Sequence, residues 1–200
     1  MLYRLIASLL RAATWWGRMQ VRGLDAVPAR GPLLVVPNHD SQWDPVVIGV
    51  ALRRRRMLRF LTRADLWRVP GLGPVLGALR QIPIERGAGD AGAIDSAVAA
   101  LAAGEAICIF PEGRLSRGER LPARSGVGRL AQACPGAHVT LCAVSGATDY
   151  VRFPRRPRVR IEFFDSRGGG LRDGEDPRAF AERLLAELRE RVPPVPAGRR

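Results

Sequence analysis

The chain contains no lysine, and all 32 of its basic residues are arginines. Enzymes that form a Schiff base through lysine, including those that use pyridoxal phosphate, are therefore excluded, as is a phosphate-binding loop that ends in lysine. No Gly-x-Ser-x-Gly segment occurs either. The sequence thus offers no serine nucleophile on a strand-to-helix turn, and its chemistry must come from other groups.

Cysteine is also scarce, with three residues: Cys108, Cys134 and Cys142. An odd count without paired spacing gives no disulfide framework. Cys108 and Cys142 lie in apolar segments that predict strands, which is typical of buried thiols in a reducing compartment. Cys134, His138 and Cys142 recur every four residues, but a Pro-Gly pair separates the first two and no second cluster follows. We expect no metal site and no cofactor.

Long apolar segments are missing as well. A membrane-spanning helix needs about 18 or more consecutive apolar residues, and the sequence has no such uncharged stretch. Residues 1–20 instead predict an amphipathic helix, because Arg4, Arg11 and Arg18 repeat every seven residues opposite an apolar face. Arg11 interrupts the apolar core that a signal peptide needs. The segment suits a membrane interface, although it could instead pack its leucines on the domain.

The net charge of +13 favours anionic partners. Arginines 53–56 and the mixed apolar and basic residues after them are typical of a membrane-facing surface, and nucleotide phosphates of coenzyme A are another possible partner. The arginines are scattered without interleaved aromatic residues or a nucleic-acid motif, so we expect no nucleic acid. A non-catalytic basic protein that binds membrane or nucleic acid is the alternative that rests on charge alone.

The order of apolar segments predicts a single α/β domain over residues 21–192, with residues 193–200 as a disordered tail. Strands are predicted at residues 19–24, 33–36, 82–84, 106–110, 139–144 and 158–163. Helices are predicted at residues 44–52, 90–103, 126–134 and 176–191. The alternating charged and apolar residues at 158–163 indicate a half-exposed edge strand.

A histidine and an aspartate follow the apolar strand at 33–36. In an ideal helix five residues turn the chain by about 500°, so His39 and Asp44 can meet only if the segment between them loops back. Pro37 ends the strand, and Asp44-Pro45 reads as the N-cap and first residue of a helix. A neutral imidazole can take a proton from a hydroxyl group, and a carboxylate on its other nitrogen fixes the tautomer.

Two later strands also deliver polar side chains at their carboxyl ends. Glu112 follows residues 106–110, and Arg86 follows residues 82–84. The planar guanidinium group of an arginine binds two oxygens of a phosphate or carboxylate at once. If the strands share a sheet, the base, the anion clamp and the carboxylate meet at one edge.

These segments resemble the motifs of the glycerolipid acyltransferase family. The matching blocks are Asn38-His39 with Asp44, Ile82 to Arg86, and Phe110-Pro111-Glu112-Gly113. A basic residue and a glycine after the third block, in the segment 121–126, are also similar to the family. Three blocks in the right order are far more specific than one, and the resemblance covers about residues 20–150. It implies a mixed sheet with helices on both sides.

The resemblance also implies a reaction. His39, held by Asp44, removes the proton from the free hydroxyl of lysophosphatidate, which attacks the thioester of acyl-CoA or acyl carrier protein and gives phosphatidate for phospholipid biosynthesis. Arg86 binds the acceptor's phosphate, Glu112 binds a glycerol hydroxyl, and the Gly113 N–H meets an oxygen. A thioester is already activated, so no metal or cofactor is needed.

The chain departs from the family at two places. Arg114-Leu115-Ser116-Arg117 follows the third block where many members carry Thr-Arg, so Arg114 or Arg117 is expected to supply that charge to the substrate. The strand at 139–144 lacks the proline of the fourth block. These departures leave glycerol-3-phosphate, another lysophospholipid or an amino-lipid open as acceptors. A lipid acceptor places the enzyme on the cytoplasmic face of the cell membrane, as a peripheral protein on anionic lipid.

Overall fold

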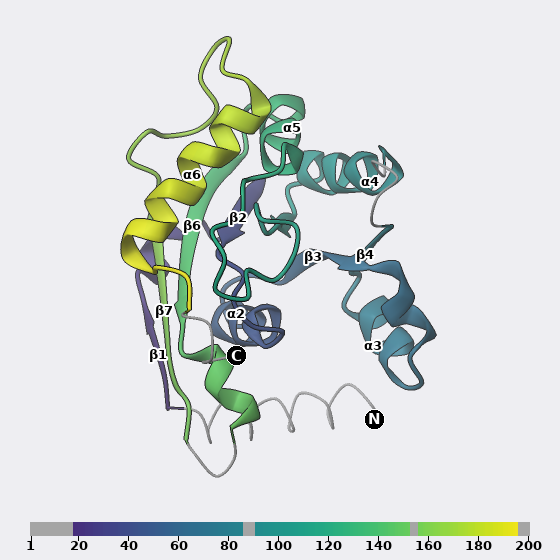
Figure 1. The fold of residues 1–200 in the computed structure, drawn as a ribbon. Coiled ribbons are helices and arrows are strands. Elements are labelled where there is room, and N and C mark those ends of the chain that lie inside the picture. Colours follow the sequence, from purple (N-terminus) through teal and green to yellow (C-terminus); the bar gives the residue numbers. More distant parts are fainter. Residues whose placement is uncertain (1–17, 86–90, 153–155, 196–200) are drawn as a thin grey trace.

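The computed structural model describes residues 18–85, 91–152 and 156–195, which form one seven-stranded sheet in the order β1-β7-β6-β2-β5-β3-β4 (Figure 1). The strands are β1 (Arg18–Arg22), β2 (Leu33–Pro37), β3 (Leu58–Arg63), β4 (Ile82–Ile84), β5 (Ala106–Cys108), β6 (His138–Ser145) and β7 (Arg158–Asp165). All neighbours are parallel except β6 and β7, which are antiparallel. The expected mixed α/β sheet is confirmed.

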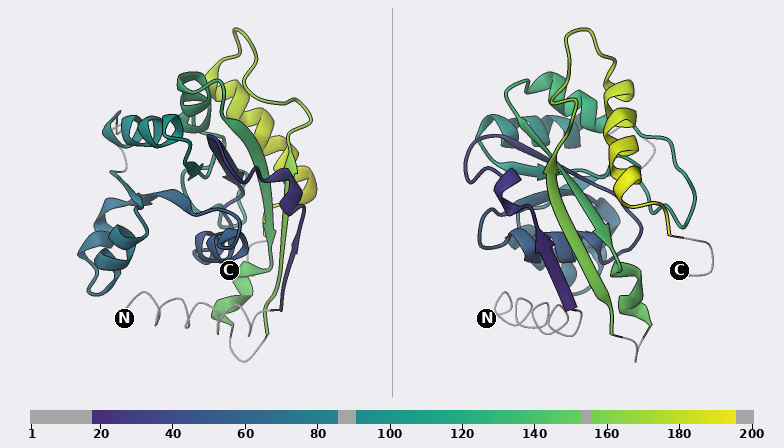
Figure 2. Two further views of the ribbon diagram at one scale, coloured as in Figure 1. Left: turned by 180° about the vertical axis from the view of Figure 1, so that it is seen from behind. Right: turned by 90° about the vertical axis from the view of Figure 1, so that its left-hand side faces the viewer.

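Helices cover both faces of this sheet. They are α2 (Asp44–Leu52), α3 (Leu72–Ala78), α4 (Ala91–Ala102), α5 (Gly126–Ala133) and α6 (Pro177–Arg191), with 3-10 turns η1 (Leu24–Ala26), η2 (Ala64–Arg68) and η3 (Ala147–Val151). Helices α4, α5 and α6 form one layer in Figure 1, and the right view of Figure 2 shows α6 along one side of β6 and β7. Helix α2 packs on the opposite face.

Strand β2 lies at the centre and is buried at all five positions. Successive side chains of a strand point to opposite faces, so Leu34 and Val36 join the core under α4, α5 and α6, while Leu33 and Val35 join the core under α2. A strand covered on both faces reads as a continuous apolar run, which is why its sequence shows no alternation.

Two features of the strands differ from the sequence analysis. No strand was predicted in the segment after the four arginines, yet it contains β3, which pairs with β5 and β4 and buries Leu58 and Phe60. The membrane-facing role of this segment stays a prediction. Strand β7 was predicted at an edge, yet it lies between β1 and β6. Its alternation has another cause: Val159, Ile161 and Phe163 face the core, while the charged residues between them lie on the less covered face.

The four arginines after α2 do not all face outward. Arg56 donates to three backbone carbonyls, those of Pro28 at 3.2 Å, Gly31 at 2.8 Å and Gly104 at 2.7 Å, and Arg55 donates to the carbonyl of Val27. Two of the four arginines therefore tie loops together at the amino ends of the central strands, which the sequence did not indicate.

The predicted last helix is confirmed. Asp176 caps α6 by accepting hydrogen bonds from the backbone N–H groups of Arg178 at 2.9 Å and Ala179 at 3.0 Å. Strand β1 begins at Arg18, and residues 1–17 of the predicted amphipathic helix lie outside the described residues, as do residues 196–200 of the predicted tail. No helix within the described ranges is long and apolar enough to span a bilayer.

Candidate active site

The loop after β2 is held to the neighbouring strand β6 by Asn38. The side chain of Asn38 is fully buried, accepts a hydrogen bond from the Val144 N–H at 2.8 Å and donates one to the Val144 carbonyl at 2.9 Å. This paired contact fixes the direction in which the chain leaves the sheet. The backbone of the next residue, His39, is therefore fixed relative to β6.

Asp44 makes the loop return on itself. It is the first residue of α2 rather than its N-cap, a position that Trp43 occupies without a side-chain hydrogen bond. The Oδ2 atom of Asp44 instead accepts hydrogen bonds from the backbone N–H groups of Asp40 at 2.8 Å and Ser41 at 2.7 Å. The predicted loop is present, and the prediction that Asp44 caps the helix is wrong because its carboxylate points back into the loop.

The His39 and Asp44 side chains meet, with 3.3 Å between Nδ1 and Oδ2. Only 1% of the Asp44 side chain and 14% of the His39 side chain are exposed. Burial raises the pKa of Asp44, although its hydrogen bond to His39 works in the opposite direction. With its proton on Nδ1, the ring has a lone pair on Nε2. The ring also stacks on Phe110 at 4.0 Å between centroids, which fixes its orientation.

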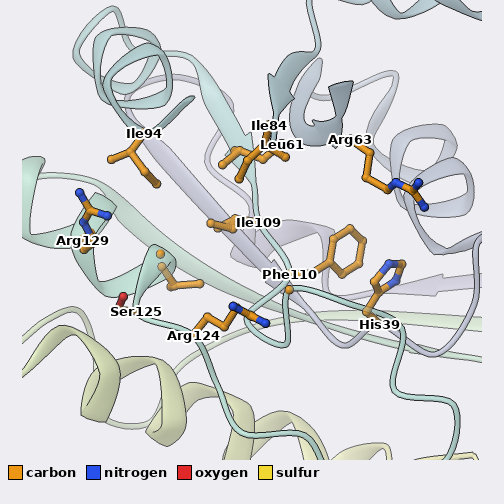
Figure 3. Close-up of a pocket in the computed structure, with 13 residues that line it drawn as sticks. His39, Leu61, Arg63, Ile84, Ile94, Ile109, Phe110, Arg124, Ser125 and Arg129 are labelled. Atoms are coloured by element: carbon orange, nitrogen blue, oxygen red, sulfur yellow. The ribbon is translucent and has the colours of Figure 1, made fainter. Parts of the chain in front are cut away.

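His39 and Phe110 lie at one end of a cavity of about 270 Å³ that extends toward α4 and α5 (Figure 3). Most of its wall is apolar, with Leu61, Ile84, Ile94, Ile109 and Val127 beside Phe110. Its cationic residues are Arg63, Arg124 and Arg129. The cavity therefore combines a base, an apolar wall and positive charge, a set that suits an amphiphile with an alkyl chain and an anionic group.

Glu112 lies behind His39 rather than in the cavity. One carboxylate oxygen accepts a hydrogen bond from the backbone N–H of His39 at 3.0 Å, and the other accepts from the guanidinium group of Arg189. The side chain is completely buried, and burial raises the pKa of this carboxyl group despite the nearby arginine. The implied contact between Glu112 and an acceptor hydroxyl stays a prediction; in this structure each carboxylate oxygen has a protein partner and the side chain is not among those that line the cavity.

Gly113 does line the cavity, and its N–H donates to the Phe110 carbonyl at 3.1 Å, so its implied contact with a substrate oxygen stays a prediction. Its φ of 66° lies in the left-handed region that favours glycine. A Cβ at this position would lie 2.6 Å from Cδ of Arg124. The glycine is therefore needed for the turn and for the close passage of the Arg124 side chain.

The arginines expected to bind the substrate are placed differently. Arg114 is half exposed and pairs with Glu119 at 3.1 Å, and Arg117 is exposed in a turn with a φ of 49°. Neither is among the described residues that line the cavity. Arg86 lies outside the described residues, so its position is untested.

Three arginines that the predictions did not assign to the site line the cavity instead. Arg124 belongs to the segment 121–126 that resembles the family, so the signal for it was present. Arg63 ends β3, a strand that the sequence analysis missed, and pairs with Asp65. Arg129 lies within α5 and has no motif of its own.

The cysteines and the second histidine lie apart from this chemistry. Cys108 and Cys142 are buried, and burial raises the pKa of both thiols well above the usual range, so neither is a nucleophile at neutral pH. His138 pairs with Asp165 at 2.8 Å on the surface. Within the described part of the chain, no group of three or more His, Cys, Asp or Glu side chains could hold a metal ion.

A base held by a buried carboxylate at the carboxyl end of a central strand, facing an apolar cavity, defines a site for transfer to a hydroxyl group. The family model described as Acyltransferase matches residues 18–145, which include this whole loop system, and the chain belongs to that family. It is therefore an acyltransferase.

Among solved structures, the chain is similar to the crystal structure of PlsC, the 1-acyl-sn-glycerophosphate (LPA) acyltransferase from Thermotoga maritima. The TM-score is 0.66 at 22% sequence identity, and the similarity covers 91% of this chain and 72% of the Thermotoga chain. At this identity the likeness establishes a shared fold. A comparison with curated proteins gave no match.

Proposed function

We propose that the protein transfers a fatty acyl group from a thioester donor, acyl-CoA or acyl carrier protein, to the free hydroxyl of lysophosphatidate. The observation that carries this proposal is the His39–Asp44 pair at the end of an apolar cavity that also holds arginines. Lysophosphatidate has the matching parts: a hydroxyl to activate, an alkyl chain and a phosphate. The structurally similar Thermotoga protein is an LPA acyltransferase, which supports the same choice of acceptor.

In the proposed reaction, Nε2 of His39 takes the proton of the acceptor hydroxyl while its oxygen attacks the thioester carbonyl. Asp44 stabilises the imidazolium ion that forms. The carbon–sulfur bond then breaks, and the departing thiolate takes the proton from His39, which returns to its neutral form. General base catalysis of this kind contributes about 100-fold to 10,000-fold in rate.

Arg124 and Arg129 are the proposed phosphate ligands. Both side chains are exposed, both line the cavity, and they lie next to its apolar wall. Arg63 lines the same cavity but already pairs with Asp65, so we assign it a smaller part. The role of Arg86 stays a prediction. Arg114 pairs with Glu119, and neither Arg114 nor Arg117 lines the cavity, so we assign them no part in phosphate binding.

We also propose that the enzyme works on the cytoplasmic face of the cell membrane as a peripheral protein. Its lipid acceptor resides in the bilayer, and its net charge of +13 would attract it to anionic lipid. Val69 and Val151 are large apolar residues with exposures of 44% and 69%. Val69 follows η2, the turn after the carboxyl end of β3, and Val151 ends η3, the turn after the carboxyl end of β6. Both valines therefore lie at the edge of the sheet from which the His39 loop leaves β2.

The test is a panel of acceptors with oleoyl-CoA in detergent, with products identified by mass spectrometry. We expect acylation of lysophosphatidate, and we expect Arg124→Met and Arg129→Met to raise its KM more than they lower kcat. Product from glycerol-3-phosphate or from a lysophospholipid without a terminal phosphate, and none from lysophosphatidate, would contradict the proposed acceptor. The panel is repeated with acyl carrier protein as donor, so that the donor is not the cause of a negative result.

A further inference from the structure

Arg189, in the last turn of α6, reaches the catalytic loop from a distant part of the chain. Its Nη1 donates to Oδ2 of Asp40 at 3.0 Å, and its Nη2 donates to Oδ1 of Asp40 at 3.1 Å. Nη2 also donates to Glu112. The side chain is only 11% exposed. One largely buried guanidinium group thus binds two carboxylates that come from two different loops.

These two carboxylates control the backbone on both sides of His39. Glu112 accepts the hydrogen bond of the His39 N–H. Asp40 accepts hydrogen bonds from the Asn38 side chain at 2.7 Å and from the Ser116 hydroxyl, and the Ser116 N–H in turn donates to the His39 carbonyl at 2.8 Å. Both polar backbone groups of His39 are therefore fixed by residues that Arg189 contacts directly or through one neighbour.

We propose that Arg189 is a positioning residue for acyl transfer, which holds Asp40 and Glu112 so that the backbone of His39 stays in its productive place. The residue lies outside residues 18–145, the range matched by the family model, so α6 contributes to the site from beyond that range. Its action is indirect, because its guanidinium group contacts the two carboxylates and not the cavity.

The balance of charge explains why a cation is needed at this point. Asp40, Asp44 and Glu112 place three buried carboxyl groups around one histidine. A buried carboxylate without a partner is costly, and removal of one member of a buried ion pair leaves the other uncompensated. Burial opposes the charge of Arg189, but its bonds to Asp40 and Glu112 outweigh this effect and raise its pKa, so the cation is retained. Without Arg189, the carboxylates of Asp40 and Glu112 would have to move apart or become protonated.

The variant that tests this proposal is Arg189→Met, which keeps much of the volume and removes the charge. We expect kcat to fall between about tenfold and 100-fold, because small displacements of a catalytic group cost that much, with little change in the KM for the acceptor. Arg189→Lys should recover part of the loss, since it restores the charge without the planar fork. Arg191→Met is the matched control: Arg191 is in the same helical turn, but it pairs with Glu162 and stacks on Phe164 at the surface.

A second variant separates positioning from general loss of structure. If Arg189 acts through Glu112, the double variant Arg189→Met/Glu112→Gln should lose no more kcat than the worse of the two single variants. Losses that multiply, or an Arg189→Met enzyme with wild-type kcat, would overturn the proposal. Thermal melts of each variant establish what fraction is folded at the assay temperature.

The kinetic test rests on the proposed function, because it measures acyl transfer. A spectroscopic measurement on the free enzyme does not depend on the identity of the substrate. The chain has two histidines, and the ring nitrogen signals of His39 and His138 can be followed separately by NMR. We expect Arg189→Met to shift the His39 ring signals and to leave those of His138, which pairs with Asp165 on the surface, unchanged. Unchanged His39 signals would count against positioning even if the acceptor proved to be another molecule.

Discussion

At the scale of single residues, one oxygen of Asp44 has two tasks. Its Oδ2 atom holds two backbone N–H groups of the loop, and it also faces Nδ1 of His39. The loop geometry and the orientation of the base therefore depend on the same atom. This explains why a spacing of five residues, which would place the side chains apart on a helix, brings them together here.

The substitution Asp44→Asn tests the second task. An amide oxygen in the place of Oδ2 can still accept both backbone hydrogen bonds and the Nδ1–H of His39, but it carries no negative charge to stabilise the imidazolium ion that forms in the reaction. We expect kcat to fall clearly, by at most about 10,000-fold, which is the loss in an enzyme where asparagine also reverses the tautomer, with the fold retained. Steady-state kinetics beside a circular dichroism spectrum measure both. A variant with nearly normal kcat would show that His39 does not need this carboxylate.

Glu112 gives a prediction about the pH dependence of stability. Burial raises the pKa of Glu112 in the folded protein above its value in the unfolded chain. A carboxyl group with a raised pKa favours the folded state most at low pH, and this contribution is lost as the pH rises through the raised pKa. Glu112→Gln removes the ionisation, so its Tm relative to wild type should increase as the pH rises from about 4.3, the ordinary glutamate pKa.

Melts of both proteins at several pH values between acid and neutral conditions measure this difference. The direction of the trend is decisive, because Arg189 is shared between two carboxylates and cannot fully offset the burial of both. A Tm difference that is constant with pH would show that the folded protein does not raise the Glu112 pKa.

The sequence located the residues of the site better than it located their roles. Segments 38–44 and 110–113 carry local patterns, and both loops lie at the site. The direction in which Glu112 turns is set by Arg189, which is 77 positions away, and nothing in the local pattern indicates it. Arg189 itself looks like any basic residue in the last turn of a helix, where positive charge is ordinary.

At the scale of elements, the contact between α5 and α6 brings two parts of the site together. Helix α5 carries Arg129 at the cavity, and α6 carries Arg189 at the catalytic loop. The two helices approach closely at Gly128, where a Cβ would lie 2.0 Å from the Pro177 carbonyl oxygen. Because that obstacle is backbone, it cannot move aside as a flexible side chain could.

Gly128→Ala should therefore destabilise the protein by about 1–3 kcal/mol, the usual cost of overpacking, measured by chemical denaturation. Gly136→Ala is the control, since no atom lies within 4 Å of a Cβ at that position. We expect the control to change stability little. Equal stability of Gly128→Ala and wild type would show that the two helices are not held at this distance.

Elements that depend on a strong local sequence pattern were predictable from the sequence. Elements that depend on pairing with distant strands were not. Helix α6 follows from Asp176-Pro177 and the apolar residues after it, which act within one segment. Strand β3 was missed because Arg59 and the arginines before it make the segment look polar although Leu58 and Phe60 are apolar. The strand forms through its pairing with β5 and β4. The position of β7 inside the sheet depends on β1, more than 130 residues earlier.

At the scale of the whole molecule, the positive charge and the proposed lipid acceptor lead to a test of the proposed membrane location. With +13 net charge, attraction to anionic lipid should be strong at low salt and weaken as salt screens it. We expect sedimentation with liposomes to increase with the fraction of anionic lipid and to decrease with salt. Binding that is the same for neutral and anionic liposomes would contradict the proposed location.

The central claim is that His39 is the base of an acyl transfer, and the presence of two histidines allows a matched test. Wild type, His39→Ala and His138→Ala are compared for phosphatidate formed from oleoyl-CoA and lysophosphatidate under conditions in which chemistry limits the rate. We predict that His138→Ala stays within about twofold of wild type, while His39→Ala falls by about 100-fold to 10,000-fold. A His39→Ala enzyme that forms phosphatidate at the wild-type rate would contradict the account.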